Sequence, residues 1–491
     1  MTATRPARIT AAGWGWRYGG RRAAAVHDVS FTIEPGERVL LLGASGAGKS
    51  TLLAGMAGLL GGADEGDETG TLLIDGGRAE AHRGRVGLVL QDPDAGVVLS
   101  KVGDDVAFGC ENLGVPAAQI PARVAEALDA VGLDVPLTRP TKALSGGQKQ
   151  RLALAGVLAM RPGVLLLDEP TANLDPHGVR EVRDAVERAV QESGATLVVI
   201  EHRTAVWADL MDRVIVVGAD GGLLADGTPA EVFARHGATL AAAGVWIPGH
   251  SVDLPVLASA RADASAAVAA SALSISRDGR TIVRSGLDLA VVRAAATVIT
   301  GPNGAGKSTL ALTLAGLLPE AAGRVETAPE LAGRSGRRPS KWTSRELLTR
   351  IGTVFQEPEH QFLASTVRDE LAIGPRSRGV DPAAVGQIVD ELLERLHLAP
   401  LAAANPFTLS GGQKRRLSVA TVLADAPPVI MLDEPTFGQD RRGWIELVQL
   451  LQSEIDAGTT VVAVTHDEDV LRHLGGHRIE LGLPVHAGVG S

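Results

Sequence analysis

The sequence predicts an α/β protein in which one domain, built on a mostly parallel sheet, occurs twice in tandem. Three observations predict this fold: a long internal repeat, short apolar runs that alternate with helical patterns, and one glycine-rich motif present in both copies. Continuous apolar runs are typical of strands in a parallel sheet that is covered on both faces. Their alternation with helices is typical of α/β layering.

The internal repeat extends over most of the 491 residues and overrules the three domains that length alone would suggest. We expect a first domain at 1–233, an alanine-rich and partly helical linker at 234–271, and a second domain at 272–491. The matching stretches are GASGAGKST at 43–51 and GPNGAGKST at 301–309, ALSGGQKQRLALAGVLA at 143–159 and TLSGGQKRRLSVATVLA at 408–424, and LLLDEPTANLD at 165–175 and IMLDEPTFGQD at 430–440.

The first copy shows the expected elements in order. A glycine-rich turn and a helix from Ser50 to about Leu60 follow the first buried run, and further helices are expected at 146–160 and 177–192. The buried strands are expected at 38–43, 86–90, 164–168, 196–200 and 213–217.

Composition and charge narrow the class of protein. The net charge is −10, from 47 basic and 57 acidic residues, which argues against a general nucleic-acid coat because phosphate binding needs a positive field. Cys110 is the single cysteine, so no intramolecular disulfide forms. The stretch 254–275 comes nearest to a membrane span, but Arg261 and Asp263 interrupt it. We expect a soluble, cytoplasmic protein without a secretory signal, held at a membrane only through a partner.

The motif GxxxxGK[ST] follows an expected strand and precedes an expected helix in both copies, which raises it above a chance glycine-rich turn. Its backbone N–H groups and the helix N-terminus converge on an anion. Lys49 and Lys307 would reach the β- and γ-phosphates, and Ser50 and Ser308 would hold Mg²⁺. The other expected nucleotide-binding residues of the two motifs are Gly43, Ser45, Gly46, Gly48, Thr51, Gly301, Asn303, Gly304, Gly306 and Thr309.

Two carboxylates end an apolar strand in each copy, in VLLLDEP and VIMLDEP. Asp168 and Asp433 would hold the metal, directly or through water, while Glu169 and Glu434 would polarise the attacking water. Phosphoryl transfer needs charge neutralisation and a positioned water more than covalent chemistry. An acidic pair that merely caps the next turn is the alternative interpretation.

A histidine follows a further strand in each copy. His202 lies 33 positions after Glu169, and His466 lies 32 positions after Glu434. A lone histidine at a strand end is most often structural, but the repeated offset favours a contact with the γ-phosphate.

The run LSGGQ, at 144–148 and 409–413 ahead of each acidic strand, resembles the signature of ABC ATPases. The resemblance implies two tandem P-loop ABC ATPase domains, each with a parallel sheet core, a helical signature subdomain and an antiparallel β part. It also implies that the two domains pair head to tail within one chain and sandwich two ATP molecules with Mg²⁺. In such a pair the signature of one domain completes the site of the other, through Ser145, Gly146, Gly147, Gln148, Ser410, Gly411, Gly412 and Gln413.

The resemblance extends to three further positions. Gln91 and Gln356 match the family's glutamine and would join the metal site, and Tyr18 matches the aromatic residue that stacks on adenine. The second copy departs from this pattern, because only Arg277 is available to stack by its guanidinium plane. The D-loops are 173–175 and 438–440, where Gln439 replaces the usual leucine. Because both copies keep the lysine, glutamine, aspartate, glutamate, histidine and LSGGQ, we expect ATP hydrolysis at both sites.

The segments QDPDAGVVLSKVGDDVAFGCEN at 91–112 and QEPEHQFLASTVRDELAIG at 356–374 are similar to the pattern of energy-coupling factor (ECF) importers. That likeness implies an ATPase motor on the cytoplasmic face of the membrane, with an integral membrane T component and a small substrate-binding S component as partners. The cargo would be a vitamin, a vitamin precursor or a transition-metal ion. The alternatives are a sugar-type importer ATPase, which usually carries one degenerate site, and a soluble ABC translation factor, which carries a long charged linker.

Overall fold

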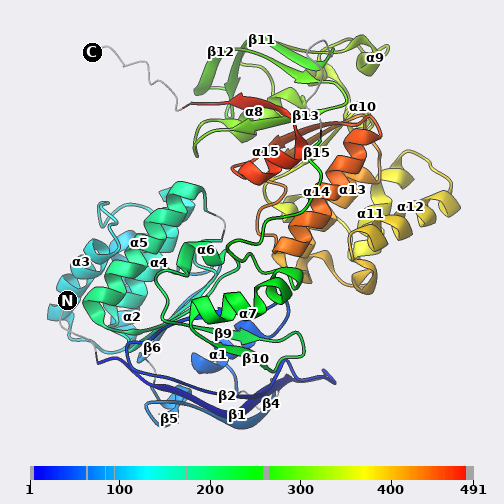
Figure 1. The fold of residues 1–491 in the computed structure, drawn as a ribbon. Coiled ribbons are helices and arrows are strands. Elements are labelled where there is room, and N and C mark those ends of the chain that lie inside the picture. The colour runs from blue at the N-terminus through cyan, green and yellow to red at the C-terminus, as the bar shows by residue number, and fades with distance from the viewer. Residues whose placement is uncertain are drawn as a thin grey trace, which may run out of the picture. The chain divides into compact units, whose positions relative to one another are not determined.

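The computed structural model describes residues 5–61, 65–82, 84–92, 94–172, 174–257 and 265–482. The chain divides into two compact units, which are described separately (Figure 1). The first unit comprises Met1–Ser251 with Asp440–Arg442, and the second comprises Val252–Gln439 with Gly443–Ser491.

The first unit is built on a six-stranded sheet in the order β10-β9-β3-β8-β7-β6. All neighbouring pairs are parallel except β10 and β9. The prediction of a mostly parallel sheet is therefore confirmed. The strands are β3 (Arg38–Leu42), β6 (Val86–Val89), β7 (Val164–Asp168), β8 (Thr196–Ile200), β9 (Arg213–Val217) and β10 (Leu223–Gly227).

Both faces of this sheet are covered, which explains the continuous apolar runs. In β3, Val39 and Leu41 pack in the cluster that contains β1 (Ile9–Tyr18) and α1 (Lys49–Met56). Leu40 and Leu42 pack in the opposite cluster, with α4 (Gly146–Ala159) and α5 (Pro176–Ser193). Alternate side chains of one strand thus enter different layers, so every position of the strand is apolar.

The antiparallel part of the first unit is a second sheet in the order β2-β1-β4-β5. Trp14 and Trp16 of β1 are buried beneath it, and Trp14 Nε1 donates to Glu68 Oε1 at 2.9 Å. The other strands are β2 (Val26–Ile33), β4 (Gly66–Ile74) and β5 (Gly77–Arg78), and the remaining helices are α2 (Val102–Asn112), α3 (Ile120–Ala130), α6 (Thr204–Trp207) and α7 (Pro229–Ala242).

The helix expected from Ser50 to about Leu60 ends earlier, at Met56. Gly58 has φ 68°, a left-handed conformation that closes a helix, and its N–H donates to the Gly55 carbonyl. Leu59 and Leu60 therefore lie beyond the helix.

The second unit repeats this architecture. Its parallel sheet has the order β15-β16-β17-β13-β18, and its antiparallel sheet has the order β12-β11-β14. The strands are β11 (Ala266–Ser276), β12 (Ile282–Val292), β13 (Ala296–Thr300), β14 (Ala322–Thr327), β15 (Ile351–Val354), β16 (Val429–Asp433), β17 (Thr460–Val464) and β18 (His477–Glu480). The helices are α8 (Lys307–Leu314), α9 (Pro329–Ala332), α10 (Ser344–Leu348), α11 (Val367–Ser377), α12 (Pro382–Arg395), α13 (Gly411–Leu423), α14 (Arg441–Asp456) and α15 (Glu468–Leu474).

The chain passes from the first unit to the second between Ser251 and Val252, inside the stretch 234–271 that the sequence suggests as a linker. Helix α7 extends into the start of this stretch, and β11 begins before its end. Residues 258–264 of the stretch lie outside the described part of the chain. Among the described helices, none has the length and apolar character needed to cross a membrane.

Candidate active sites

The glycine-rich loop of each unit connects a central strand to a helix, β3 to α1 and β13 to α8. Gly48 has φ 95°, and a Cβ there would lie 2.2 Å from the Ala25 carbonyl oxygen, so only glycine fits. The backbone N–H groups at the start of a helix then face one point, the arrangement that binds phosphate. Gly306 of the second unit has the same left-handed conformation, with φ 91°.

A buried lysine holds each loop. Lys49 Nζ donates to the carbonyl oxygens of Gly43 and Ala44, both at 2.9 Å. Lys307 Nζ likewise donates to the carbonyl oxygens of Gly301 at 2.8 Å and Pro302 at 3.1 Å. Burial lowers the pKa of Lys49, although the charges of Glu169 and Asp168 oppose this effect. The structure thus brings the predicted lysines and acids of the first unit together.

The acidic pairs lie at the ends of β7 and β16. Glu169 has φ 46° and Glu434 has φ 50°, a left-handed conformation that is uncommon for any residue except glycine. Such strain persists where the surroundings impose it, and it concentrates at functional sites. The same strain at the same motif position in both units supports a chemical role for both glutamates.

The aspartates of these pairs face the hydroxyls of the glycine-rich loops. Burial raises the pKa of Asp168, Glu169 adds to the increase, and a hydrogen bond from Ser50 opposes it. Burial likewise raises the pKa of Asp433, against a hydrogen bond from Ser308. Each unit therefore pairs a serine hydroxyl with an aspartate at a strand end, partly buried in the first unit and buried in the second.

The second unit contains a cavity of about 310 Å³ whose lining includes Ser308, Gln356 and Asp433. Asp433 Oδ1 is buried and has no hydrogen-bond partner within the described residues. A buried carboxylate oxygen without a partner calls for one, and Mg²⁺ takes oxygen ligands from one or two protein groups together with phosphates. The residues present therefore fit a magnesium–nucleotide complex.

The histidine of the first unit contacts the glutamate directly. His202 Nε2 lies 3.0 Å from Glu169 Oε1, and Gln91 Nε2 donates to Glu169 Oε2 at 2.9 Å. Burial alone would raise the pKa of Glu169, but the hydrogen bond and the charge of His202 outweigh burial and leave that pKa lowered. The first site thus keeps its glutamate charged and held from two sides.

The histidine of the second unit has different partners. His466 Nε2 lies 2.9 Å from Lys307 Nζ, 3.2 Å from Asn303 Oδ1 and 3.6 Å from Glu434 Oε1. Burial raises the pKa of Glu434 to about 7, with the charge of Asp433 adding to it and a hydrogen bond from Thr465 opposing it. The two sites share the glutamate and the histidine, but the hydrogen bonds of these residues differ.

The residues expected near adenine also differ. The Tyr18 hydroxyl lies 3.2 Å from Thr51 Oγ1, which places the ring beside the glycine-rich loop. Arg277 instead lines the cavity with Ser308 and Asp433, and its charge favours the ionised form of Asp433. Arg277 therefore lines the same cavity as the residues expected to hold Mg²⁺ in the second site.

The signature residues form the starts of long helices. Ser145 Oγ accepts from the Gln148 backbone N–H at 3.3 Å, and Gln148 Oε1 accepts from the Ser145 N–H at 3.1 Å. This reciprocal capping box recurs at Ser410 and Gln413 ahead of α13. Gly146, Gly147, Gly411 and Gly412 thus lie in the first turns of α4 and α13.

The D-loops fall partly within the described residues. Asp175 caps α5 through the Gly178 N–H at 2.7 Å, whereas residue 173 lies outside the described part of the chain. In the second unit Gln439 Nε2 donates to the Gly412 carbonyl at 3.1 Å. The glutamine that departs from the usual leucine thus contacts the signature helix of its own unit.

The sequence motifs did not single out two buried residues near the acids. Arg415 of α13 donates to the carbonyl oxygens of Phe355 at 2.7 Å and of Gln356, and Glu201 accepts the His202 N–H at 3.0 Å. A comparison of the copies could have found both, because Gln150 occupies the position of Arg415 and Thr465 occupies that of Glu201.

The fold and the sites define a phosphate-loop ATPase with two catalytic domains in one chain. The ABC transporter family matches residues 26–172 and 285–437. The chain belongs to this family of ABC transporter ATPases, which bind ATP with Mg²⁺ and hydrolyse it.

Relatives match the chain over most of its length. It is 35% identical over 472 residues to YkoD of Bacillus subtilis (strain 168), whose name assigns it provisionally to HMP/thiamine import as an ATP-binding protein. The match covers 90% of this chain and 84% of that protein. An ABC transporter ATP-binding protein of Streptomyces avermitilis is 34% identical over 516 residues, with 94% and 90% covered.

A solved structure of archaeal aABCE1, a ribosome recycling factor in complex with the stalk protein aP1, has a TM-score of 0.60 to this chain. Its sequence identity is 21%, and the likeness covers 95% of this chain and 87% of that one. At this identity the likeness concerns the fold alone.

Proposed function

We propose that this ABC ATPase is the motor subunit of an ECF-type importer. It would couple ATP hydrolysis to uptake of a vitamin, a vitamin precursor or a transition-metal ion, and it would bind the cytoplasmic face of the membrane through an integral T component and a small S component. The observation that carries the proposal is an apolar surface residue that follows the glutamine of each site and that a buried acid holds in place.

In the second unit this acid is Glu370 of α11, which is buried. Its Oε2 accepts the backbone N–H groups of Leu363 at 2.8 Å and Ala364 at 2.6 Å. The side chain of Leu363 is 80% exposed. We infer that this loop contacts another protein, because the buried carboxylate fixes the loop that presents Leu363 to solvent.

The first unit repeats the arrangement. Asp105 of α2 is buried, and its Oδ1 accepts the N–H groups of Val98 at 2.8 Å and Leu99 at 2.6 Å. Val98 is 58% exposed. Asp105 and Glu370 are acids of the sequence pattern that resembles ECF ATPases, so the pattern has a physical role in both units. The provisional assignment of the relative YkoD to HMP/thiamine import supports a vitamin precursor among the cargoes.

The same proposal assigns the chemistry at the two sites. Bound Mg²⁺ would neutralise charge on the phosphates, held by Ser50, Gln91 and Asp168 in one site and by the matching residues of the other. Glu169 would polarise the attacking water, and His202, which lies beside Glu169, would contact the γ-phosphate. The matching residues are Ser308, Gln356, Asp433, Glu434 and His466.

We further propose that Ser145 and Ser410 each complete the site of the opposite domain. Their place at the N-termini of α4 and α13 supports this assignment, because the start of a long helix favours a phosphate. ATP would then hold the two domains together, and hydrolysis would release them.

The test is affinity purification of the tagged chain from gently solubilised membranes of its native host. We expect an integral T component and one small hydrophobic S protein, whose ligand identifies the cargo. Recovery of a sugar-type membrane pair, or of ribosomes without any membrane protein, would overturn the ECF proposal.

Two variants sharpen this experiment. Leu363→Asp and Val98→Asp should lower recovery of the membrane partner while ATP hydrolysis by the purified chain stays unchanged. Leu59→Asp is the matched control, because Leu59 is exposed but lies just beyond α1. Equal losses in all three variants would show that the apolar residues are not specific contacts.

A further inference from the structure

The residues on either side of the histidine differ between the two copies. The first copy reads Glu201-His202-Arg203, and the second reads Thr465-His466-Asp467. An acid therefore precedes the histidine in one copy and follows it in the other. The threonine of the DEPT motif, Thr171 or Thr436, is present in both.

In the first unit the acid that precedes the histidine in the sequence binds this threonine. Glu201 is 4% exposed, and its Oε2 accepts a hydrogen bond from Thr171 Oγ1 at 2.5 Å. Its Oε1 accepts the backbone N–H of His202 at 3.0 Å. Glu201 thereby links the histidine turn to the segment that follows Glu169.

In the second unit the acid that follows the histidine in the sequence binds the threonine. Asp467 Oδ2 accepts hydrogen bonds from Thr436 Oγ1 at 3.3 Å and from Trp444 Nε1 at 2.7 Å. The Asp467 N–H donates to Thr465 Oγ1 at 3.1 Å. Both units thus bond the threonine to a carboxylate next to the histidine. In the first unit that carboxylate also accepts the histidine's own N–H, whereas in the second unit a backbone hydrogen bond from His466 goes to Glu434.

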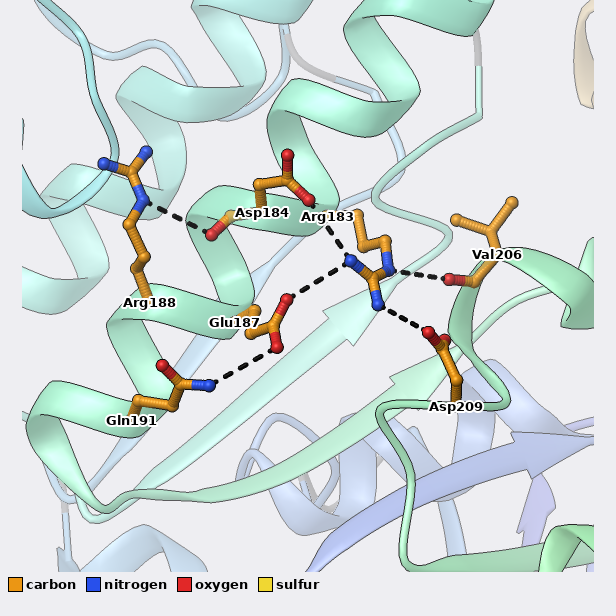
Figure 2. Close-up of polar contacts among 7 residues, drawn as sticks. All are labelled: Arg183, Asp184, Glu187, Arg188, Gln191, Val206 and Asp209. Carbon is orange, nitrogen blue, oxygen red and sulfur yellow. Dashed lines mark hydrogen bonds and ion pairs between the residues drawn. The ribbon is translucent and has the colours of Figure 1, made fainter.

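The histidine turn of the first unit is held beyond Glu201 as well. The carbonyl oxygen of His202 accepts the Trp246 N–H at 3.2 Å, so hydrogen bonds fix both sides of the residue. Figure 2 shows how α5 holds the segment that follows. Arg183 Nε donates to the Val206 carbonyl at 3.1 Å, and Nη2 donates to Asp209 Oδ2 at 2.8 Å.

We propose that Glu201 is the positioning residue that holds His202 against Glu169 at the first site. The bond to the His202 N–H fixes the peptide from which the imidazole extends, and the imidazole then lies 3.0 Å from Glu169. Glu201 itself does not touch the reacting atoms. The proposal rests on ATP hydrolysis, which the family establishes, and its failure would leave the importer proposal intact.

The test replaces the pattern of the first copy by that of the second in the full chain. Glu201→Thr removes the acid, and Glu201→Thr with Arg203→Asp restores an acid on the other side of the histidine. If hydrolysis must alternate between the two sites, we expect Glu201→Thr to lower kcat for ATP hydrolysis by about 10-fold. A loss of this size is typical when a residue that orients a functional side chain is replaced. If the sites fire independently, the loss is about 2-fold. KM for ATP should stay nearly constant, and the double variant should recover at least half of the lost kcat.

Glu201→Gln is the conservative control. The amide oxygen still accepts the His202 N–H, and the amide nitrogen can donate to Thr171, so kcat should stay close to that of the unsubstituted chain and clearly above that of Glu201→Thr. Thermal melting of each variant separates loss of fold from loss of position. The proposal is wrong if Glu201→Thr melts normally and keeps full kcat, or if Glu201→Gln loses as much kcat as Glu201→Thr. A rise in KM without a fall in kcat would also overturn it.

Discussion

The buried arginine of α13 leads to a prediction about the stability of the second unit. Arg415 is 3% exposed and donates to the carbonyl oxygens of Phe355 at 2.7 Å, of Gln356, and of Asp433 at 3.4 Å. These groups follow β15 and end β16, so one side chain ties the signature helix to the segment that carries Gln356 and to the metal-site strand. Arg415→Met removes the donor and keeps a flexible apolar side chain.

The magnitude follows from two opposing effects. Burial lowers the pKa of Arg415 to about 10, and the same burial penalises the charged form by about 3 kcal/mol, which methionine relieves. The carbonyl oxygens of Phe355 and Gln356 each lose a charge-assisted hydrogen bond. Losing the bonds themselves costs roughly 1.5–3 kcal/mol each. We expect a net loss of about 2 kcal/mol.

The first unit provides the matched control at the same motif position. Gln150 is also buried, but its Nε2 donates to the Leu90 carbonyl at 3.5 Å, the outer limit of a hydrogen bond. Its Oε1 has no hydrogen-bond partner in the part of the chain that the structure describes. Gln150→Met therefore removes an unsatisfied buried acceptor and should stabilise the first unit by about 1 kcal/mol.

Calorimetry of the full chain measures both effects. A loss of 2 kcal/mol should lower the melting transition of a domain of this size by about 4–8 °C. Arg415→Met should shift one transition down, and Gln150→Met should leave that transition in place and raise the other. The reasoning is refuted if Arg415→Met shifts neither transition, or if the two variants destabilise the chain equally.

Three further outcomes are expected. Glu169→Gln and Glu434→Gln should each lower ATP turnover strongly, by about 10²-fold or more at the altered site, and a variant that retains full turnover in a phosphate-release assay would mark a site that only binds. Hydrogen bonds from Ser335 and Thr343 lower the pKa of Glu346 to about 2, below the ordinary 4.5, so its stabilisation of α10 is present above pH 4.5 and is lost as the pH falls towards 2. Hydrogen exchange over α10 should rise in that window, and Glu346→Gln should remove the pH dependence. Burial raises the pKa of the Cys110 thiol, so a disulfide reagent should not react with it until the chain unfolds, and reaction with the native chain would contradict its burial.

The strands were predicted closely because their signal is local. β7, β8 and β9 span the residues expected from the apolar runs, since a strand covered on both faces is apolar at every position. The helix after the first glycine-rich loop was predicted too long, because apolar residues continue past Gly58, where the backbone turns. The capping boxes of α4 and α13 could have been predicted from serine followed three residues later by glutamine.

The hydrogen-bond partners around the acids could not be predicted in this way. Thr171 and Glu201 are 30 positions apart, and Arg415 is 60 positions from Phe355, so each contact depends on how separate strands end at the same edge of the sheet. A motif specifies which residues reach that edge, but not which of several polar neighbours each one bonds. The difference between the partners of His202 and His466 therefore became visible only in the structure.

The two copies differ in residues that hydrogen-bond to the expected catalytic residues or their loops, while those expected residues themselves are the same. The lysines, aspartates, glutamates and histidines match in both copies, whereas Gln150 is replaced by Arg415, and Glu201 by Thr465. Each replacement alters what holds a reacting residue or its loop: a buried cation joins the Gln356 segment in the second unit, and a buried acid joins His202 in the first. Because orientation of a bound water governs phosphoryl transfer, such supports can set different rates at two sites that share the same lysine, aspartate, glutamate and histidine. The Glu201 exchange isolates one of these supports.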